Sequence, residues 1–225
     1  MIALSVNMQA KQIIKLLQEM GNAANLEGMK RYAIDTSNSF GVNMPEIRAF
    51  AKSYKRDHEL ALQLWDSGIR EAMILASLID DPKMINKAQI NKWVKDFNSW
   101  DVCDQTCINL FKKTPYAIDK AKEFSTRKDE YVKRTGFVLM ACYAVDVKTG
   151  NEETFDDFLT IIEREAWDGR NFVKKAINWA LRQIGKRNDI SRKKAISTAK
   201  RILKQSSKSA QWIAKDALKE LEKEL

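Results

Sequence analysis

Apolar residues recur along almost the whole chain at the three- and four-residue spacing of a single helix face. No segment sustains the alternation of apolar and polar residues that marks a half-buried strand. Glycine and proline, the residues that most often form turns, number only 8 and 3 among 225 residues. The sequence therefore predicts an all-α protein of long helices with short connections, long enough to bury a substantial core.

The apolar spacing predicts thirteen helical segments, and polar or proline residues mark several of their starts. Pro45 and Glu46 open one of them, because proline suits the first turn of a helix. Asp189 or Ser191 is expected to cap a later helix, and Thr154 another. The predicted segments are 8–20, 25–34, 45–56, 58–66, 69–80, 84–97, 100–112, 115–123, 129–146, 154–166, 170–185, 190–205 and 208–223.

Four six-residue segments resemble one another, each with a charged residue first and a small residue third. They begin at Arg70, Asp104, Arg134 and Lys174, with offsets of 34, 30 and 40 residues. Helical pairs of about this length stack into solenoids. No linker rich in proline or serine divides the chain. We therefore expect one domain, 1–225, forming an α-solenoid whose concave face carries these charged residues.

The positive charge of the chain is concentrated toward its carboxyl end. Residues 170–215 hold fourteen Lys and Arg and one acid, Asp189, a net charge of +13 in a chain whose total is +9. Such a one-sided basic surface is typical of proteins that bind a phosphate backbone. A solvated helix face, an acidic protein partner or an anionic membrane surface are the alternatives, and the interrupted pattern fits a membrane less well.

The sequence argues against several other classes of protein. No run of 18 apolar residues exists, so we expect no membrane span, and no basic stretch precedes the first apolar residues as in a signal peptide. Three cysteines without a CxxC motif fit a reduced, cytoplasmic protein. Cys103 and Cys107 are one helical turn apart, but the only histidine, His58, is distant, so we expect core cysteines and no metal. His58 itself is expected at the surface.

Trp100 and Asp104 lie four residues apart in a predicted helix, which puts both on one helix face. When a basic protein binds a polyanion, a carboxylate on its binding surface requires an explanation, because like charges repel. One reason is that Asp104 meets a positive charge on the nucleic acid itself.

These residues belong to a longer set that resembles the AlkD family of alkylpurine DNA glycosylases. The set comprises Trp100 with Asp104, Lys133-Arg134 at the start of an apolar helix, and the segment Phe172–Arg182, and the stretch Phe40–Lys52 is similar to the amino-terminal signature of that family. The resemblance covers roughly residues 30–205. It implies a solenoid of HEAT-like repeats, with a concave basic face, that acts in base excision repair of DNA alkylation damage.

By this resemblance the chain removes cationic bases such as 3-methyladenine and 7-methylguanine from double-stranded DNA, with lesions left largely in the duplex. It implies Asp104, Trp100 and Trp179 as catalytic residues and Arg134 as a phosphate contact, with Lys133 as the alternative to Arg134. Lys174 and Arg182 are further candidates for DNA binding. We expect a monomer that needs no metal and no organic cofactor.

Other interpretations remain open at the level of sequence. A catalytically silent repeat module that binds DNA or structured nucleic acid is the main alternative, and a protein-binding scaffold is a third. Large aromatic residues are most often core residues, and without the resemblance Trp100 and Trp179 would be assigned there. We assign Trp65, Trp93, Trp167 and Trp212 to the core.

Overall fold

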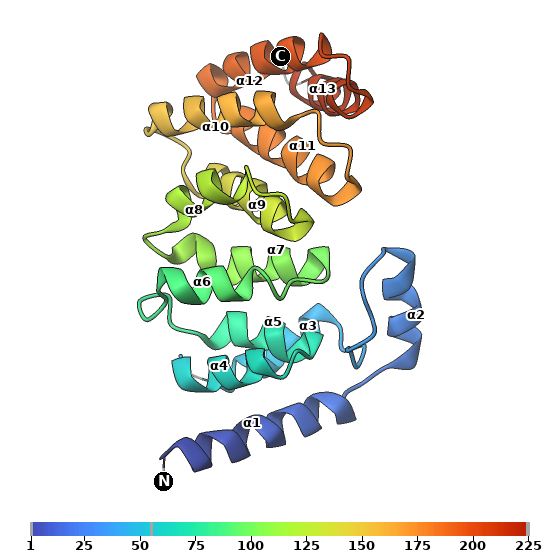
Figure 1. Cartoon of the computed structure of the whole chain (residues 1–225), viewed down its shortest axis with the longest axis vertical. Helices are drawn as coiled ribbons and strands as arrows, with labels where there is room; N and C mark the ends of the chain where they lie inside the picture. Colours follow the sequence, from blue (N-terminus) through green and yellow to red (C-terminus); the bar gives the residue numbers. More distant parts are fainter. Residues whose placement is uncertain (1, 55, 224–225) are drawn as a thin grey trace. The chain divides into compact units, whose positions relative to one another are not determined.

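The computed structural model describes residues 2–54 and 56–223, which fold into two compact units, Met1–Thr114 and Pro115–Leu225 (Figure 1). Among these described residues there are thirteen α-helices, one short 3-10 helix and no strand, so the prediction of an all-α fold is confirmed. The predicted single domain 1–225 stays a prediction. It includes residues 1, 55, 224 and 225, and the predicted helix 45–56 includes residue 55, all of which lie outside the described residues.

The first unit is organised around α5, which packs against α3, α4 and α7. Its core contains the parallel stack of Trp65 and Trp93, whose ring centroids are 3.8 Å apart, with Phe97 and Phe111 beside them. Its helices are α1 (Ile2–Glu19), α2 (Ala23–Arg31), α3 (Met44–Ala51), α4 (His58–Asp66), α5 (Arg70–Ile79), α6 (Lys87–Trp93), α7 (Trp100–Asn109) and the 3-10 helix η1 (Phe111–Lys113).

The second unit is organised around α11, which packs against α9 on one side and α13 on the other. α8 and α9 approach closely at Gly136, where a Cβ atom would lie 2.4 Å from the backbone nitrogen of Ser125. Only glycine fits such an approach. The helices of this unit are α8 (Ala117–Phe124), α9 (Glu130–Asp146), α10 (Glu152–Glu165), α11 (Asn171–Gly185), α12 (Asp189–Leu203) and α13 (Lys208–Leu221).

The helix starts follow local side-chain chemistry, although not always that of the predicted residues. Pro45 lies in the first turn of α3 as predicted, behind a capping box formed by Asn43 and Glu46. The predicted caps Asp189 and Ser191 are wrong, because both lie inside α12 and Asn188 accepts the hydrogen bond of the Ser191 amide. The carboxamide of Asn188 reaches the amides of the first turn from one residue earlier.

Thr154 is likewise not a cap. α10 begins two residues earlier, after Asn151, whose φ of 57° places it in the left-handed region. Asparagine tolerates that conformation better than most residues, so the chain turns there into the helix. Several predicted helices also ran too far or began too late. α3 ends at Ala51, α6 spans only Lys87–Trp93 of the predicted 84–97, and α1 already begins at Ile2.

Several side-chain hydrogen bonds within each unit join residues separated by about one repeat length. In four of those in the first unit the separation is 31 or 32 residues, and in the second unit the value 38 recurs. The pairs of the first unit are Ser39–Glu71, Trp65–Asp96, Arg70–Asp101 and Ser77–Asn109. Those of the second unit are Arg134–Phe172, Arg182–Glu220, Lys194–Asp156 and Arg201–Glu163. These separations are typical of stacked helical-pair repeats.

Two of the six tryptophans differ from their predicted positions. Trp65 and Trp93 are buried as predicted, whereas the predictions for Trp167 and Trp212 are wrong, because their side chains are 59% and 40% exposed. Trp167 lies in the connection between α10 and α11, where no helical pattern directs it inward. Trp212 lies on the outward face of α13. Its neighbour Ile213 points into the core, and successive residues of a helix point in different directions.

His58 opens α4, but it is not the surface group that we predicted. Its Nδ1 atom lies 2.7 Å from Oδ1 of Asp80, whose side chain is fully buried at the end of α5. Burial raises the pKa of Asp80, and the hydrogen bond from His58 opposes that rise.

Cys103 and Cys107 are buried in the core as predicted. Within residues 2–54 and 56–223, no helix combines the length and apolar character that crossing a bilayer requires.

Candidate functional site

α7 places Trp100 and Asp104 one turn apart on the same helix, so the predicted i, i+4 geometry is present. Asp104 is only 8% exposed, and Trp100 is partly exposed. The indole Nε1 of Trp100 donates a hydrogen bond to the carbonyl of Tyr32 at 3.0 Å. The ring is therefore fixed between α7 and the end of α2, beside a carboxylate at the edge of the core.

A buried ion pair lies directly under the first turn of α7. Nε of Arg70 donates to Oδ2 of Asp101 at 2.6 Å, and the Ser99 hydroxyl donates to the other oxygen at 2.5 Å. All three side chains are buried. Asp101 immediately follows Trp100, so this pair sets the position at which the site helix begins.

Glu71, the neighbour of Arg70, is 0% exposed and holds the connection that precedes α3. Its two carboxylate oxygens accept hydrogen bonds from the Ser39 hydroxyl at 2.7 Å and from the backbone amides of Phe40 and Gly41, both at 3.0 Å. The Arg70 guanidinium also contacts Glu71, with Nη1 3.2 Å from Oε1. Buried charges are tolerated where they are paired and hydrogen-bonded in this way.

Two further contacts reach α7 or the residues just before it. The Asn98 amide donates to Asp35 at 2.8 Å, and Nη2 of Arg48 on α3 donates to the Gln105 side chain at 3.3 Å. Residues from the end of α2, from α3 and from α5 thus converge on the start of α7. Sequence reasoning missed this support, although two adjacent charges at the head of the otherwise apolar α5 were a usable signal.

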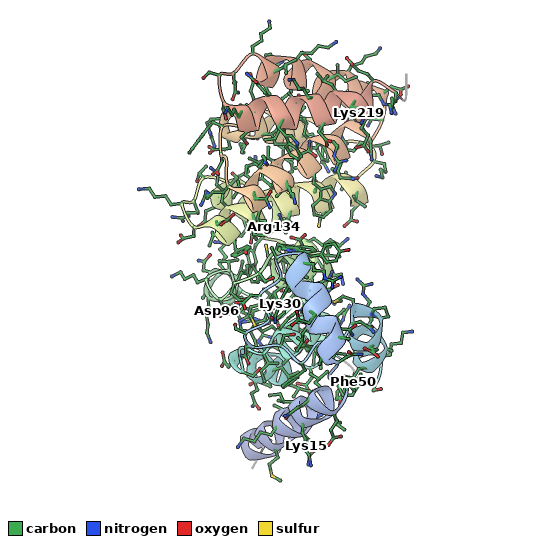
Figure 2. The ribbon with its side chains drawn as sticks, turned by 90° about the vertical axis from the view of Figure 1, so that its right-hand side faces the viewer. Lys15, Lys30, Phe50, Asp96, Arg134 and Lys219 are labelled. Carbon is green, nitrogen blue, oxygen red and sulfur yellow. The ribbon has the colours of Figure 1, made fainter. Side chains whose placement is uncertain are left out.

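Arg134 lies on α9 in the second unit, where Figure 2 labels it. Its side chain is buried, and Nη1 donates to the backbone carbonyl of Phe172 at 2.6 Å. The arginine therefore joins α9 to the first turn of α11. A role in phosphate binding stays a prediction.

Lys133, the predicted alternative to Arg134, is enclosed by acidic side chains. Its Nζ atom lies 2.8 Å from Glu165 and 3.0 Å from Asp168, and it is 4.9 Å from the centre of the Trp167 ring. Only 3% of the residue is exposed. Two carboxylates therefore compensate the charge of Lys133.

Asp168 is the centre of this acidic group. Burial alone would raise its pKa, but hydrogen bonds from Arg170 and Lys133 and the charge of Lys133 outweigh burial and lower the pKa of Asp168 to about 2. Arg170 holds both carboxylate oxygens, through Nε at 3.0 Å and Nη2 at 2.6 Å. The carboxylate is therefore ionised at every physiological pH.

The remaining predicted site residues lie on α11. Trp179 is partly exposed, and Nζ of Lys174 lies 4.9 Å from the centre of the Trp212 ring on α13. Arg182 contacts two acids of α13, with Nη1 2.5 Å from Glu220 and Nε 3.8 Å from Asp216. The second unit thus holds all the predicted site residues except Trp100 and Asp104, which lie together in the first unit.

Acidic residues compensate much of the charge of the basic segment 170–215. Several of its cations form ion pairs: Arg170 with Asp168, Arg187 with Glu152, Lys194 with Asp156, Lys200 with Glu222, and Arg201 with Glu163. In the part of the chain that the structure describes, other exposed lysines of this segment form no ion pair. These are Lys175, Lys193, Lys204, Lys208 and Lys215.

No group of three or more His, Cys, Asp or Glu side chains among the described residues could hold a metal ion. The part of the chain that the structure describes includes at least two surface clefts. One in the first unit, of about 350 Å³, is lined by Trp65, Asp96 and Lys92 among others, and one in the second unit, of about 260 Å³, by Asp156, Lys194 and Arg201 among others. Neither contains a predicted site residue.

The chain matches a family model described as "DNA alkylation repair enzyme" over residues 13–221. It is also similar to a solved structure described as "a new family of proteins related to the HEAT-like repeat DNA glycosylases with affinity for branched DNA structures". The TM-score is 0.79 at 20% sequence identity, over 95% of this chain and 94% of that chain. This likeness confirms the predicted HEAT-like repeat fold. A search of curated protein sequences found no match.

Proposed function

We propose a specific activity for this chain, which belongs to the DNA alkylation repair enzyme family. It is a DNA glycosylase that hydrolyses the N-glycosidic bond of positively charged N3- and N7-alkylpurines in duplex DNA. The observation that carries the proposal is the pair on α7, where Asp104 lies in a nearly buried position one turn from the anchored ring of Trp100.

The chemistry of a cationic alkylpurine calls for an ionised carboxylate rather than for a proton donor. When the glycosidic bond breaks, its electron pair stays with the base, which leaves as a neutral molecule and needs little proton donation. Positive charge then develops on the deoxyribose. A fixed carboxylate near that sugar stabilises the oxocarbenium-like transition state, as carboxylates do in glycoside hydrolysis. Water adds to the sugar carbon and loses a proton, which leaves an abasic site.

Trp100 and Trp179 supply the selectivity in this proposal. The face of an indole attracts a cation, by roughly 0.5–2 kcal/mol for each contact. A neutral purine gains no such attraction, so the charged lesion is favoured over an undamaged base. The hydrogen bond of Trp100 to Tyr32 fixes one of these rings in advance of binding.

Arg134 is the proposed phosphate contact, and Lys174 and Arg182 are secondary ones. Arginine presents a planar set of donors that fits phosphate oxygens. Lys133 neutralises the carboxylates of Glu165 and Asp168, which makes it a weaker candidate for an external phosphate. Arg182 contacts Glu220 and Asp216, which compensate its charge.

The test is the single-turnover release of 7-methylguanine from a methylated duplex by the wild type and by the Asp104→Asn variant. We expect the variant to release the base at least about 100-fold more slowly, the usual loss when one electrostatic contact to a transition state is removed. DNA binding should be unchanged or slightly tighter, because a negative charge near phosphates is gone.

The matched control is Asp119→Asn, which removes an exposed carboxylate of α8 from outside the proposed site. It should release 7-methylguanine at the wild-type rate. An Asp104→Asn variant that releases the base as fast as this control would refute the assigned role of Asp104.

A catalytically silent module that binds DNA is the second candidate. The solved relative described as having affinity for branched DNA structures favours it, as do the internal partners of Arg134, Lys133 and Arg182. Salt-sensitive DNA binding by the wild type, without release of 3-methyladenine or 7-methylguanine, would establish this candidate in place of the glycosylase.

A further inference from the structure

The exposed face of α13 carries a stripe of three lysines and one tryptophan. Lys208, Trp212, Lys215 and Lys219 follow one another at intervals of four, three and four residues, which aligns them along one side of the helix. All four are exposed, and Figure 2 labels Lys219 on this helix. The stripe is about 16 Å long, since an α-helix rises about 1.5 Å per residue.

Trp212 is an unusual residue for an exposed position, because large aromatic side chains are normally buried. The opposite face of α13 already supplies the core of the unit with Ile213, Ala214 and Leu221, all of which are fully buried. The indole is therefore not needed for packing. Lys174 of α11 holds its ammonium group 4.9 Å from the ring centre, so the second helix adds a cation beside the exposed ring.

The charge around Trp212 is positive. Lys208, Lys215 and Lys219 form no ion pair with any residue that the structure describes. The nearest acids of α13 are engaged elsewhere: Asp216 contacts Arg182, and Glu220 contacts Arg182 and Lys186. The stripe thus offers a ring between ammonium groups and no uncompensated carboxylate of its own.

We propose that this stripe, Lys208-Trp212-Lys215-Lys219 together with Lys174, binds single-stranded nucleic acid, with an unpaired base stacked on Trp212. Aromatic side chains that stack on bases, interleaved with cations that follow the backbone, are the physical basis of single-strand binding. Within a duplex both faces of each base are covered, so the ring can select unpaired nucleotides. The inference goes beyond the glycosylase activity and does not depend on it.

A membrane surface fits the stripe less well than a nucleic acid does. A helix that lies in a bilayer interface inserts a broad apolar face, and the apolar face of α13 is already buried inside the unit. The exposed face offers one aromatic ring among charged groups. A single ring with a high density of positive charge complements a chain of phosphates and bases.

The experiment measures the affinity of the full chain for a fluorescein-labelled oligothymidylate of about 16 nucleotides, and for a blunt duplex, by fluorescence anisotropy. Trp212→Leu keeps an apolar side chain but removes the ring. We expect it to weaken single-strand binding by about five- to 150-fold while it changes duplex binding by less than about twofold. Loss of both affinities in equal measure, or of neither, would overturn the proposal.

Charge provides a second and independent measurement. Lys215→Gln should reduce the slope of log affinity against log salt concentration by about 0.7 for the single strand, the value expected for one lost phosphate contact. Lys193→Gln is the matched control, because Lys193 is an exposed lysine of α12 without an ion pair among the described residues. Equal slopes for the two variants would refute the phosphate contact.

The outcomes also separate other partners and the proposed enzyme activity. Binding of polyglutamate or of anionic phospholipid vesicles that depends on Trp212, without binding of oligothymidylate, would replace the proposal. Glycosylase activity can fail in the wild type while oligothymidylate binding still depends on Trp212, in which case this inference stands alone. Circular dichroism and the melting temperature of each variant confirm that it is folded.

Discussion

Arg70 and Asp101, which are 31 residues apart in sequence, form a buried ion pair in which Nε lies 2.6 Å from Oδ2. Asp101 stands in the first turn of α7, between Trp100 and Asp104. The pair therefore fixes the helix that presents both proposed catalytic residues of the first unit, while Arg70 also contacts Glu71 at 3.2 Å. We therefore expect changes to this pair to affect both the stability of the chain and the proposed catalysis.

We expect Asp101→Asn to lower the free energy of unfolding by about 2–3 kcal/mol. Removal of one partner of a buried ion pair typically costs about 3–5 kcal/mol, and Glu71 remains beside Arg70 to reduce that cost. Release of 7-methylguanine should also slow, because the start of α7 shifts. Urea unfolding and single-turnover assays measure the two effects. The control, Lys92→Gln, breaks an exposed pair with Asp66 and should stay within about 0.5 kcal/mol of wild type.

The lowered pKa of Asp168 predicts that the free energy of unfolding depends on pH. Its pKa falls from 3.8 to about 2 in the folded chain, so the unfolded state binds the proton more readily. The resulting stabilisation, about 2 kcal/mol, is fully present above about pH 4 and is lost as the pH falls toward about 2. Urea unfolding at a series of pH values should show this loss in the wild type. In Asp168→Asn the loss over the same interval should be smaller by about this amount, because Glu123 and Asp35, whose pKa values are also lowered, still contribute. An undiminished slope would contradict the assignment.

Two glycines should respond in opposite directions to replacement by alanine. Gly136→Ala should destabilise the chain, because the new Cβ would lie 2.4 Å from the Ser125 nitrogen and 2.8 Å from the Ala121 carbonyl oxygen, both backbone atoms. Gly28→Ala, in α2, meets nothing within 4 Å and should stabilise by up to about 1 kcal/mol through helix propensity. Melting temperatures measured side by side test both. A stabilising Gly136→Ala would mean that α8 and α9 are not so closely packed.

Trp93 and Trp167 provide a test of which tryptophans support the core. Trp93 is fully buried in its stack with Trp65, so Trp93→Ala should cost about 3–5 kcal/mol. Trp167 is 59% exposed and contacts the Lys133 ammonium, so Trp167→Ala should cost no more than about 1 kcal/mol. Chemical denaturation of the two variants measures both losses in the free energy of unfolding. Similar losses would show that Trp167 is buried more deeply than described.

The sequence predicted the helices well because their apolar spacing is a local property. It also placed Trp100 and Asp104 one turn apart on a helix, which the structure confirms. The support beneath that helix escaped prediction, because the pairing of Arg70 with Asp101 depends on which helices stack. Apolar spacing describes a single helix face and carries no information about a partner 31 residues away.

The errors have equally physical causes. Trp167 was assigned to the core by residue type alone, yet it lies in a connection whose neighbours set no inward direction. Lys133 and Arg134 are adjacent in α9, and the sequence left Lys133 open as the alternative to Arg134. The pairing of Lys133 with Glu165 and Asp168 could not be predicted, because these carboxylates come from another helix and from the connection that follows it.

The 38-residue separation shared by several side-chain pairs of the second unit has a consequence for how that unit comes apart. Each pair joins a helix to the helix one repeat later, so no bond of this set reaches further along the array. A repeat at the end of such an array has a neighbour on one side only, whereas an inner repeat is held from both. The unit should therefore open from its outer helices inward. Amide hydrogens of α13 should exchange with solvent before those of α11, which packs against α9 as well as α12 and α13.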